Sequence, residues 1–504
     1  MNDALIVAPL LLPAFAGTGT LLFLRRRRWI GSAISIGSAV GLILVSFILL
    51  GWATADRPIA YALGDWPAPF GIVLVLDRLS ALMLVLTALL GLAISVHATL
   101  TGLDRKGWHF HSLFQFELLG LNGAFLTGDL FNLFVFFEVL LIASYGLLLH
   151  GQGSRRLTAG VQYVIVNLIG STLFLVALGL LYGLTGTLNM ADMASRAAML
   201  PTGDQGLARA AGLLLVAVFA LKAALLPLHL WLPRTYAAAA PAVAALFAIM
   251  TKVGAYAVIR IAPLIFGDAA GAFLLPSALG TMLLGFAGLV AARCLRDMAA
   301  FGLIGSTAML LTAVALFDQQ AMAAALYYLP HTTISAALLF LTVDLIIRWR
   351  DNEDAAIVPT SPYWGQKKLA FLFLASAVAM SGMPPLSGFI GKLLILRATL
   401  VSPLVVAIWA IVLGTSLMAL IGLARAGSTL FWKEDVTRSL AADLPAPSRM
   451  EALPAFFLLV LLVSLTLGSG PATAYMEATS AQIFDAPTYI HSVLGAGEGG
   501  PSTK

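Results

Sequence analysis

Four charged side chains interrupt long apolar stretches: Glu138 in LFNLFVFFEVLLIASYGLLL, Lys222 in VAVFALKAALLPLHLWLP, Lys252 in LFAIMTKVGAYAVI and Lys392 in SGMPPLSGFIGKLLIL. A charge in the middle of a transmembrane helix costs roughly 2.5–3.5 kcal/mol on insertion scales, so each group needs a partner, a polar cavity or a shifted pKa. Glu138 is too far from either helix end for its side chain to reach the membrane surface. A structural ion pair or a lysine that reaches the interface is the alternative interpretation, above all for Lys252.

An acid and a lysine together suit proton transfer. Loss of hydration lowers the pKa of a buried lysine and a nearby carboxylate raises it, so a change in their separation would switch the lysine between binding and releasing a proton. Two histidines extend this relay: His229, seven residues after Lys222, and His331 in YYLPHTTISAALLF. A lone histidine on an apolar face is more often held by packing, and that alternative stays open for both.

Composition places these groups in a membrane protein. Of the 504 residues, 60% are hydrophobic and 11% are charged, whereas soluble domains contain about 25% charged residues. The net charge of +5 is spread over short loops, which argues against a nucleic-acid partner and for membrane topology. A single cysteine, Cys294, leaves no disulfide framework or thiolate metal site, and no nucleotide loop or His-Glu-x-x-His motif is present. We therefore predict no enzyme activity, no cofactor and no metal site.

The apolar runs predict an all-α membrane protein with about fourteen transmembrane helices. We expect these helices near 4–24, 29–52, 71–99, 111–128, 129–150, 159–183, 207–229, 237–262, 270–292, 299–317, 321–347, 369–400, 402–424 and 452–470. The tail after residue 471 contains Gly, Pro, Ser and Thr and predicts a loosely ordered peripheral segment.

Alternate loops carry most of the positive charge, which predicts that these loops lie in the cytoplasm and that both termini lie outside. The basic residues on that side are Arg25, Arg26, Arg27, Arg28, Arg105, Lys106, Arg155, Arg156, Arg234, Arg293, Arg296, Arg348, Arg350, Lys367, Lys368, Arg425, Lys433, Arg438 and Arg449.

Prolines interrupt two of the charged helices. Pro227 and Pro233 break the helix of Lys222, while Pro384 and Pro385, with Gly388 and Gly391, break the helix of Lys392. Paired broken helices are typical of inverted-repeat transporters, and five helix steps separate these two. We therefore predict N-terminal helices at 1–110, two inverted five-helix repeats at 111–262 and 270–424, and a last helix with its tail at 425–504.

The remaining polar positions favour structural roles. Asp77 and Arg78 open the third helix, and Asp129 with Asn132 opens the fifth, where helix capping is the simpler interpretation. His97, His109 and His111 lie near the positive-side interface, where access and packing roles are not separable.

Three stretches carry a resemblance to a known family: GDLFNLFVFFEVLLIASYGLL, LKAALLPLHLWLPRTYAAAAPAVAALFAIMTKVGAYA and SGMPPLSGFIGKLLIL. The chain resembles the antiporter-like subunits of respiratory complex I and of the multisubunit Mrp/Pha cation/proton antiporters, most of all the D-type subunit of the latter. The resemblance spans nearly all the predicted helices. It implies a hetero-oligomeric membrane complex whose sibling subunits complete the ion pathway, within lipid.

The resemblance also implies residue roles. Glu138 takes the family's helix 5 acid, Lys222 its helix 7 lysine, Lys252 the central helix 8 lysine, His331 the helix 11 histidine and Lys392 the terminal group on the broken helix 12. His229 lies in the helix 7 motif, where it would bridge Lys222 to Lys252. The sequence departs from many relatives at Ser335, where a lysine is often found, so a relay there would use water or His331.

Two functions and one non-transporting role follow. The first is a subunit of a monovalent cation (Na⁺ or K⁺)/proton antiporter, with protons moving along the buried charges. The alternative is a proton-pumping subunit of an NADH–quinone oxidoreductase or membrane hydrogenase, driven by redox energy from another subunit. The third hypothesis is a non-conducting scaffold, in which the buried charges only fix helix register. It predicts that replacing Glu138 by a neutral isostere leaves transport intact.

Overall fold

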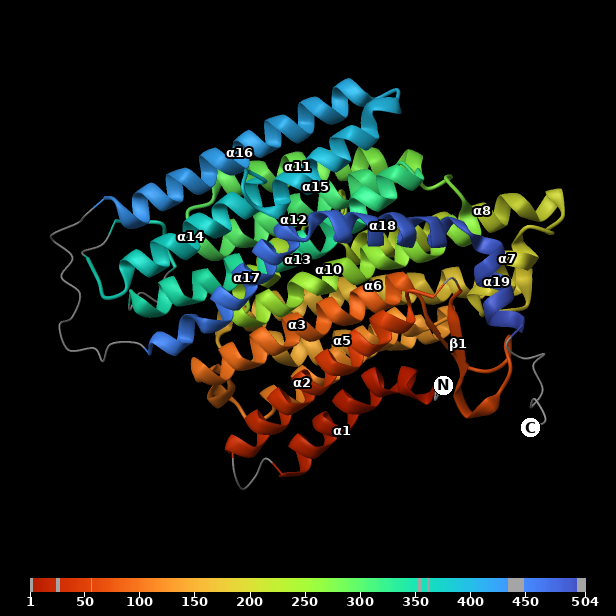
Figure 1. Cartoon of the computed structure of the whole chain (residues 1–504), viewed down its shortest axis with the longest axis horizontal. Helices are drawn as coiled ribbons and strands as arrows, with labels where there is room; N and C mark the ends of the chain where they lie inside the picture. Colours follow the sequence, from red (N-terminus) through yellow and green to blue (C-terminus); the bar gives the residue numbers. More distant parts are fainter. Residues whose placement is uncertain are drawn as a thin grey trace.

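The computed structural model describes residues 3–23, 28–55, 57–350, 355–359, 362–433 and 448–495. Long helices lie side by side along the longest axis of the molecule (Figure 1). The helices are α1 (Ala8–Phe23), α2 (Arg28–Trp52), α3 (Arg78–Leu100), α4 (Phe110–Leu126), α5 (Leu130–Leu149), α6 (Ser154–Thr185), α7 (Met190–Ala197), α8 (Thr202–Lys222), α9 (Trp231–Ala238), α10 (Pro241–Ile261), α11 (Gly271–Ala291), α12 (Leu295–Val314), α13 (Gln319–Trp349), α14 (Gln366–Ser381), α15 (Ser387–Ala398), α16 (Val405–Phe431), α17 (Leu453–Leu467), α18 (Ser469–Phe484) and α19 (Ala486–Leu494). Two short strands, β1 (Ile59–Ala62) and β2 (Val73–Leu76), pair antiparallel.

The prediction of an all-α membrane protein is confirmed. Among the described residues, twelve helical segments are long and apolar enough to cross a membrane. The short helix α4, with 17 residues, and the broken pair α14 and α15 coincide with the other two predicted crossings. The chain is thus a multi-pass membrane protein.

The third helix begins later than the sequence predicts. Residues 71–76 were expected to be helical, but β2 occupies Val73–Leu76 and the helix begins at Arg78. The run VLVL suits a strand, and Asp77 then accepts a hydrogen bond from the backbone N–H of Ser80 at 2.8 Å. The predicted capping role of Asp77 is confirmed, as is that of Asp129, whose carboxylate accepts from the N–H groups that open α5.

The expectation of a loose C-terminal tail was wrong. Residues 469–494 form α18 and α19, and α18 continues beyond α17 along α13 (Figure 1). The Ser480 hydroxyl donates to the Gln319 carbonyl at 2.7 Å, and the Tyr475 hydroxyl donates to the Arg78 carbonyl at 2.8 Å. The composition misled because a short helix with little apolar character is stabilised here by tertiary contacts rather than by its own sequence.

Both predicted helix breaks exist. The helix of Lys222 ends at that residue and α9 begins at Trp231, which leaves Pro227 in the break. Pro233, contrary to the prediction, lies in the first turn of α9, where proline is tolerated because the N–H groups of that turn have no partner within the helix. The second break separates α14 from α15 and contains Pro384 and Pro385. Proline lacks the N–H that a continuing helix requires, which explains why the breaks fall there.

Gly388 and Gly391 do not belong to the second break, contrary to the prediction. Both lie inside α15, where their role is close packing against α13. A Cβ on Gly388 would lie 2.7 Å from Nε2 of His331, and one on Gly391 would lie 2.7 Å from the Tyr328 ring. Glycine is required there because the helices touch, not because the backbone bends.

Two bridges between backbone segments repeat one connection pattern. Asp129, just before α5, bridges to Asn189, which follows α6. Cys294, just before α12, bridges to Ala356, which follows α13. The same link recurs in both halves of the chain, as two related units would require. The boundaries at 111–262 and 270–424 stay a prediction.

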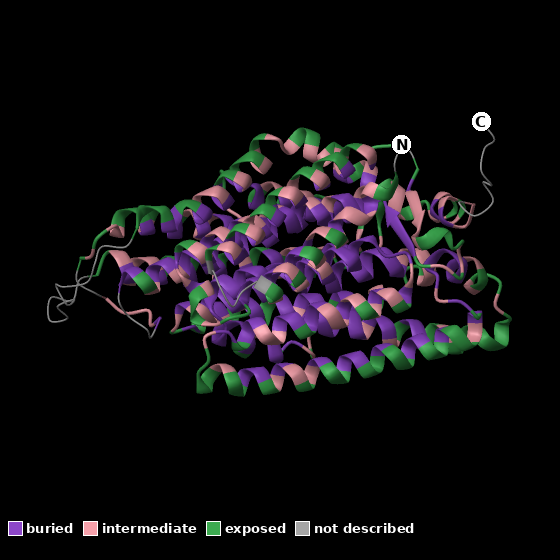
Figure 2. Ribbon diagram, turned by 90° about the horizontal axis from the view of Figure 1, so that it is seen from below, coloured by how far each residue is buried: buried purple, intermediate pink, exposed green. Residues whose placement is uncertain are grey.

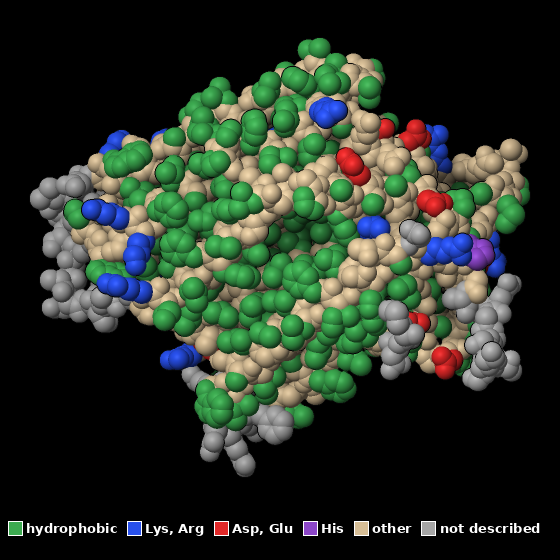
Figure 3. Space-filling view, in the orientation of Figure 1, with side chains coloured by type: hydrophobic (Ala, Val, Ile, Leu, Met, Phe, Trp, Pro, Cys, Tyr) green, Lys and Arg blue, Asp and Glu red, His purple; other side chains and the backbone are tan. Residues whose placement is uncertain are grey.

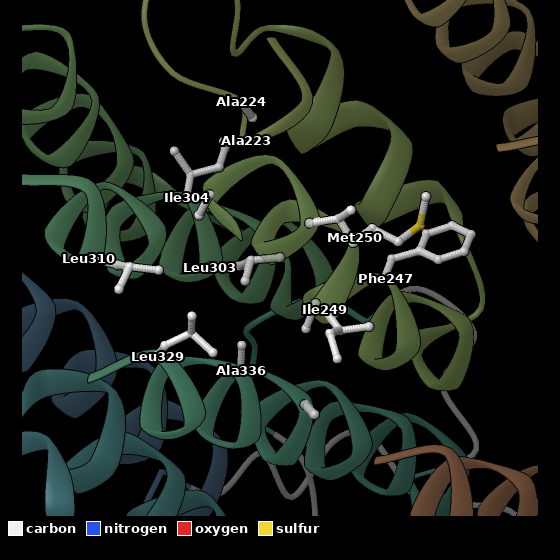
Figure 4. Close-up of a cluster of buried hydrophobic side chains, with 14 of the residues drawn as sticks. Ala223, Ala224, Phe247, Ile249, Met250, Leu303, Ile304, Leu310, Leu329 and Ala336 are labelled. Atoms are coloured by element: carbon white, nitrogen blue, oxygen red, sulfur yellow. The ribbon is translucent and has the colours of Figure 1, made fainter. Parts of the chain in front are cut away.

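The core is centred on α10. All 21 residues of this helix are buried, and Figure 2 shows the buried residues concentrated inside the bundle. Apolar side chains from α10, α12 and α13 interdigitate there, among them Phe247, Leu303 and Leu329 (Figure 4). Polar groups on these helices are therefore enclosed by protein.

The charged side chains visible on one surface face lie mainly toward the ends of the bundle. On the face in Figure 3 a broad apolar area separates the two ends, and the acidic side chains gather toward the end that carries α7 and α19. The start of α1 and helix α19 share that end. Of the predicted cytoplasmic charges, Arg25, Arg26, Arg27 and Arg438 lie outside the described residues.

Candidate functional site

Helix α6 holds both members of the first charge pair. The Ser171 hydroxyl donates a hydrogen bond to Oε1 of Glu138, which projects from α5. Four residues earlier, Oδ1 of Asn167 accepts from Nζ of Lys222 at 3.1 Å. Residues four apart lie on one face of a helix. The acid and the lysine, which form no direct ion pair among the described residues, are thus fixed one turn apart on a common support.

A third polar residue extends this face of α6. Tyr163 precedes Asn167 by one turn, and its hydroxyl lies 3.0 Å from the hydroxyl of Ser144 on α5. The amide of Asn167 donates to the Tyr163 carbonyl at 2.9 Å, which fixes the orientation of Oδ1 toward Lys222. Tyr163, Asn167 and Ser171 form a polar stripe on α6, which we call the α6 stripe. The stripe was not predicted from the sequence because these neutral residues raise no insertion cost comparable to a charge.

The break after α8 positions Lys222. Ala224 adopts a positive φ of 57°, which turns the chain out of the helix directly after the lysine. The indole N–H of Trp231 donates to the Leu221 carbonyl at 3.1 Å and stabilises the unwound segment. Lys222 therefore ends a half-helix, where the negative end of the helix dipole favours a positive charge.

Lys252 lies close to this break but has partners of its own. Its Nζ donates to the Thr307 hydroxyl of α12 at 2.7 Å. Gly254, two residues on, packs so tightly on α8 that a Cβ there would lie 2.7 Å from the Phe219 carbonyl oxygen and 2.7 Å from the Ala223 nitrogen. Glycine thus brings α10 into backbone contact with the end of the Lys222 helix. Lys252 is fully buried, so it does not reach the interface.

Hydroxyl groups continue from Lys252 toward the second half. Ser306, beside Thr307, accepts a hydrogen bond from the Thr332 hydroxyl of α13 at 2.8 Å. Thr332 adjoins His331, whose Nδ1 lies 2.9 Å from the Ser387 hydroxyl at the start of α15. Ser335 takes no part, since its hydroxyl donates to the Thr332 carbonyl at 3.3 Å. No hydrogen bond joins Thr307 to Ser306 or Thr332 to His331 among the described residues, so a relay at this level through water or His331 stays a prediction.

Lys392 joins the second break to α16. Its Nζ donates to the Ser381 carbonyl at the end of α14, at 2.8 Å, and to the Ser416 hydroxyl at 2.7 Å. Ser381 ends one half-helix, so the ammonium again meets a helix C-terminus. A neutral amine keeps two N–H groups, enough for both acceptors, although it donates more weakly than the ammonium, so these contacts are compatible with loss of a proton.

His229 is the least connected candidate. It is buried in the unwound segment between α8 and α9, and its Nδ1 has no hydrogen-bond partner among the described residues. Neither Lys222 nor Lys252 is among its hydrogen-bond partners in the described part of the chain. Its role as a bridge stays a prediction.

A buried ion pair that was not predicted from the sequence lies at one end of the bundle. Arg260 of α10 binds the Asp77 carboxylate through both terminal nitrogens, and its guanidinium lies over the rings of Tyr256 and Tyr489 at 5.5 Å. Burial raises the pKa of Asp77, but the charge and hydrogen bonds of Arg260 outweigh burial and hold that pKa below its usual value. Arg260 was overlooked because a basic residue near a helix end normally extends to the interface.

Two further pairs, toward the other end of α3, involve histidines. Nε2 of His97 lies 2.9 Å from Oδ2 of Asp344 on α13. Similarly, Nε2 of His111 lies 3.3 Å from Oδ2 of Asp104. Both histidines are buried and tie neighbouring segments together, which favours a packing role for them.

Comparison with known proteins identifies the family of the chain. Residues 127–419 match the family model described as NADH:quinone oxidoreductase/Mrp antiporter, TM. The chain is 39% identical over 539 residues to the D-type subunit of a probable K(+)/H(+) antiporter of Rhizobium meliloti, with 99% of both chains covered. It is 35% identical over 504 residues to the D-type subunit of a Na(+)/H(+) antiporter of Alkalihalophilus pseudofirmus, with 98% of this chain and 100% of the relative covered. A chain in the structure of the Mrp complex from Dietzia sp. DQ12-45-1b superposes with a TM-score of 0.89 at 28% identity, covering 98% of this chain and 100% of that one. The chain therefore belongs to the family of NADH:quinone oxidoreductase and Mrp antiporter membrane subunits, within its group of D-type antiporter subunits.

Proposed function

We propose that this chain is the subunit of a multisubunit Na⁺ or K⁺/proton antiporter that carries protons along Glu138, Lys222, His229, Lys252, His331 and Lys392. The single observation that carries the proposal is the attachment of Glu138 and Lys222 to one face of α6, one turn apart and without a direct ion pair. A pair that only fixed helix register would be most stable in direct contact. A separated pair leaves both groups free to change charge.

The proposed coupling is electrostatic. A proton that arrives at Glu138 removes its negative charge and with it part of the attraction that favours the charged form of Lys222. Lys222 then releases a proton toward Lys252, which α10 brings near through Gly254. The hydroxyls of Thr307, Ser306 and Thr332 lead on to His331. The charge state thus passes along the row.

Partner subunits are part of this proposal. Glu138 is only partly buried, and its neighbours Phe131, Val135 and Ile142 on α5 are exposed apolar residues. An acid at this depth next to lipid is costly, so a sibling subunit is expected to cover this face of α5. The proposed location is the bacterial cell membrane, with both termini outside.

Cation-dependent proton flux tests the function. A host without its own antiporters would express the whole operon with the wild-type protein, Glu138→Gln or the control Asp204→Asn, and membrane vesicles would be prepared from each strain. The control removes an exposed acid at the start of α8. We expect Na⁺ or K⁺ to dissipate a pH gradient with wild type and control, and not with an assembled Glu138→Gln complex. Proton pumping that appears only on adding a reductant would replace the proposal by the redox-driven alternative.

A further inference from the structure

One buried acid has no part in the row described so far. Glu117 lies in the middle of α4, its side chain is fully buried, and neither carboxylate oxygen has a hydrogen-bond partner among the described residues. Burying an unpaired carboxylate costs far more than burying the neutral acid. Glu117 therefore holds a proton at rest.

The packing of α4 on α5 sets the depth of Glu117. The two helices are antiparallel neighbours, and a Cβ on Gly120 would lie 2.7 Å from the backbone nitrogen of Leu140. Because the helices are antiparallel, the residue three before Gly120, Glu117, is level with the residue three after Leu140, Ala143. Glu138 is five residues from that point, or about 7 Å along the helix axis. The two acids thus lie at neighbouring depths on adjacent helices.

The α6 stripe begins at the same level. Ser144, next to Ala143, shares a hydroxyl contact of 3.0 Å with Tyr163, and either hydroxyl can be the donor. Glu117 interacts electrostatically with Tyr163 and with Tyr236 of α9. The Tyr236 hydroxyl donates to the Phe247 carbonyl at 2.9 Å, so its proton is engaged. The Ser144 hydroxyl also donates to the Leu141 carbonyl of its own helix at 2.7 Å, so a relay through this pair requires the Ser144 hydroxyl to turn from that carbonyl toward Tyr163.

No other charged group competes for Glu117 at this level among the described residues. On the helices packed against α4, α1 and the described side chains of α2 include no titratable residue, and α3 carries Arg78 and His97 only near its ends. On α10, Lys252 and Arg260 are engaged by Thr307 and Asp77, and Tyr256 donates to the Phe125 carbonyl at 2.7 Å. The titratable or polar groups near this level on α5, α6 and α9 are hydroxyls. The exception is Glu138, five residues along α5 from Ala143.

We propose that Glu117 is a proton-storage site that exchanges protons with Glu138 along the Ser144 and Tyr163 hydroxyls. In each exchange Glu117 loses one proton and becomes a carboxylate, while the Glu138 carboxylate gains one and becomes neutral. A proton from the end of the bundle where α4 begins then restores Glu117. The inference rests on the proposed function and adds a loading step ahead of the α6 stripe.

Proton flux in vesicles with the whole complex tests the inference. Glu117→Gln keeps the size and hydrogen-bonding capacity of the side chain but holds no exchangeable acid proton. We expect an assembled Glu117→Gln complex to lose about a hundredfold in flux, and Glu117→Asp to recover part of it. Gln115→Met is the matched control, because Gln115 is a buried polar residue of α4 that binds Ser35 and Ser38 on α2 instead. Its flux should stay at the wild-type level.

Infrared difference spectroscopy of the purified complex supplies a readout that packing would not move. The carbonyl stretch of a protonated buried carboxyl should be present in wild type, shifted in Glu117→Asp and absent in Glu117→Gln. Wild-type flux in Glu117→Gln, or an unchanged carbonyl signal in either variant, would overturn the inference while leaving the antiporter function standing. Absence of cation-dependent flux in wild type would instead remove the proposed function.

Discussion

Asn167 and Ser171 lie one turn apart on α6, and each holds a charged side chain from a different helix, Lys222 from α8 and Glu138 from α5. The separation of acid and base is therefore set by a third helix rather than by their mutual attraction. Small movements of α6 would change both hydrogen bonds together. This makes the α6 stripe the first place to test the proposed coupling.

Removal of the Asn167 amide should impair transport without loss of assembly. A hydrogen bond to a charged group contributes about 2 kcal/mol, so Asn167→Leu should change the population of the correctly placed ammonium roughly thirtyfold. Cation-dependent proton flux is the measurement. Thr172→Val, an exposed residue of α6 whose hydroxyl bonds only its own helix, is the control. Equal flux in both variants would contradict a role for the stripe.

Gly254→Ala should push α10 away from the end of α8. The new methyl group would meet the backbone at Phe219 and Ala223, so we expect a destabilisation of about 1–3 kcal/mol and a lower melting temperature of the complex. Gly179→Ala on α6 meets nothing within 4 Å and should leave the melting temperature unchanged. Similar melting of the two variants would show that the close approach is not required.

The Asp77 and Arg260 pair should make stability depend on acid pH. Because the pKa of folded Asp77 is held below its usual value of 3.8, the pair stabilises the protein above about pH 4, and this contribution is lost as the pH falls through the lowered pKa. Thermal unfolding at neutral and acid pH measures the effect.

Asp77→Asn leaves Arg260 buried without a counter-charge, for which we expect a loss of about 3–5 kcal/mol at neutral pH. The variant should also lack the loss of stability that the wild-type protein shows as the pH falls through the pKa of Asp77. Asp204→Asn serves as the exposed control. A full acid step retained in Asp77→Asn would assign the pH dependence to other carboxyls.

Truncation after Gly468 should prevent stable assembly. It removes α18, including the Ser480 and Tyr475 hydroxyls that bind Gln319 and Arg78. Recovery of the truncated chain with its partner subunits after detergent extraction is the measurement. Normal recovery would show that α18 and α19 are dispensable for the bundle.

Much of the fold was predictable because hydrocarbon imposes long apolar runs. All the expected crossings correspond to helices, and the charges at Glu138, Lys222, Lys252 and Lys392 were identifiable by their cost. Neutral partners such as Asn167 and Thr307 could not be identified from the sequence, since threonine and asparagine within a helix carry no distinctive cost of membrane insertion. Helix α18 was missed because its stability comes from α13. Glu117 lies in FQFELLGL, where the charge itself was a usable signal that was not taken up.

The complete burial of α10 has a consequence for biogenesis. This helix carries Lys252 and Arg260 and has no face that meets lipid in the folded chain. Alone in a bilayer it would bear the insertion cost of Lys252 at mid-helix, roughly 2.5–3.5 kcal/mol on insertion scales. It is therefore expected to leave the translocon only when α3, α12 and α13 can enclose it, so the order of membrane insertion need not follow the order of synthesis.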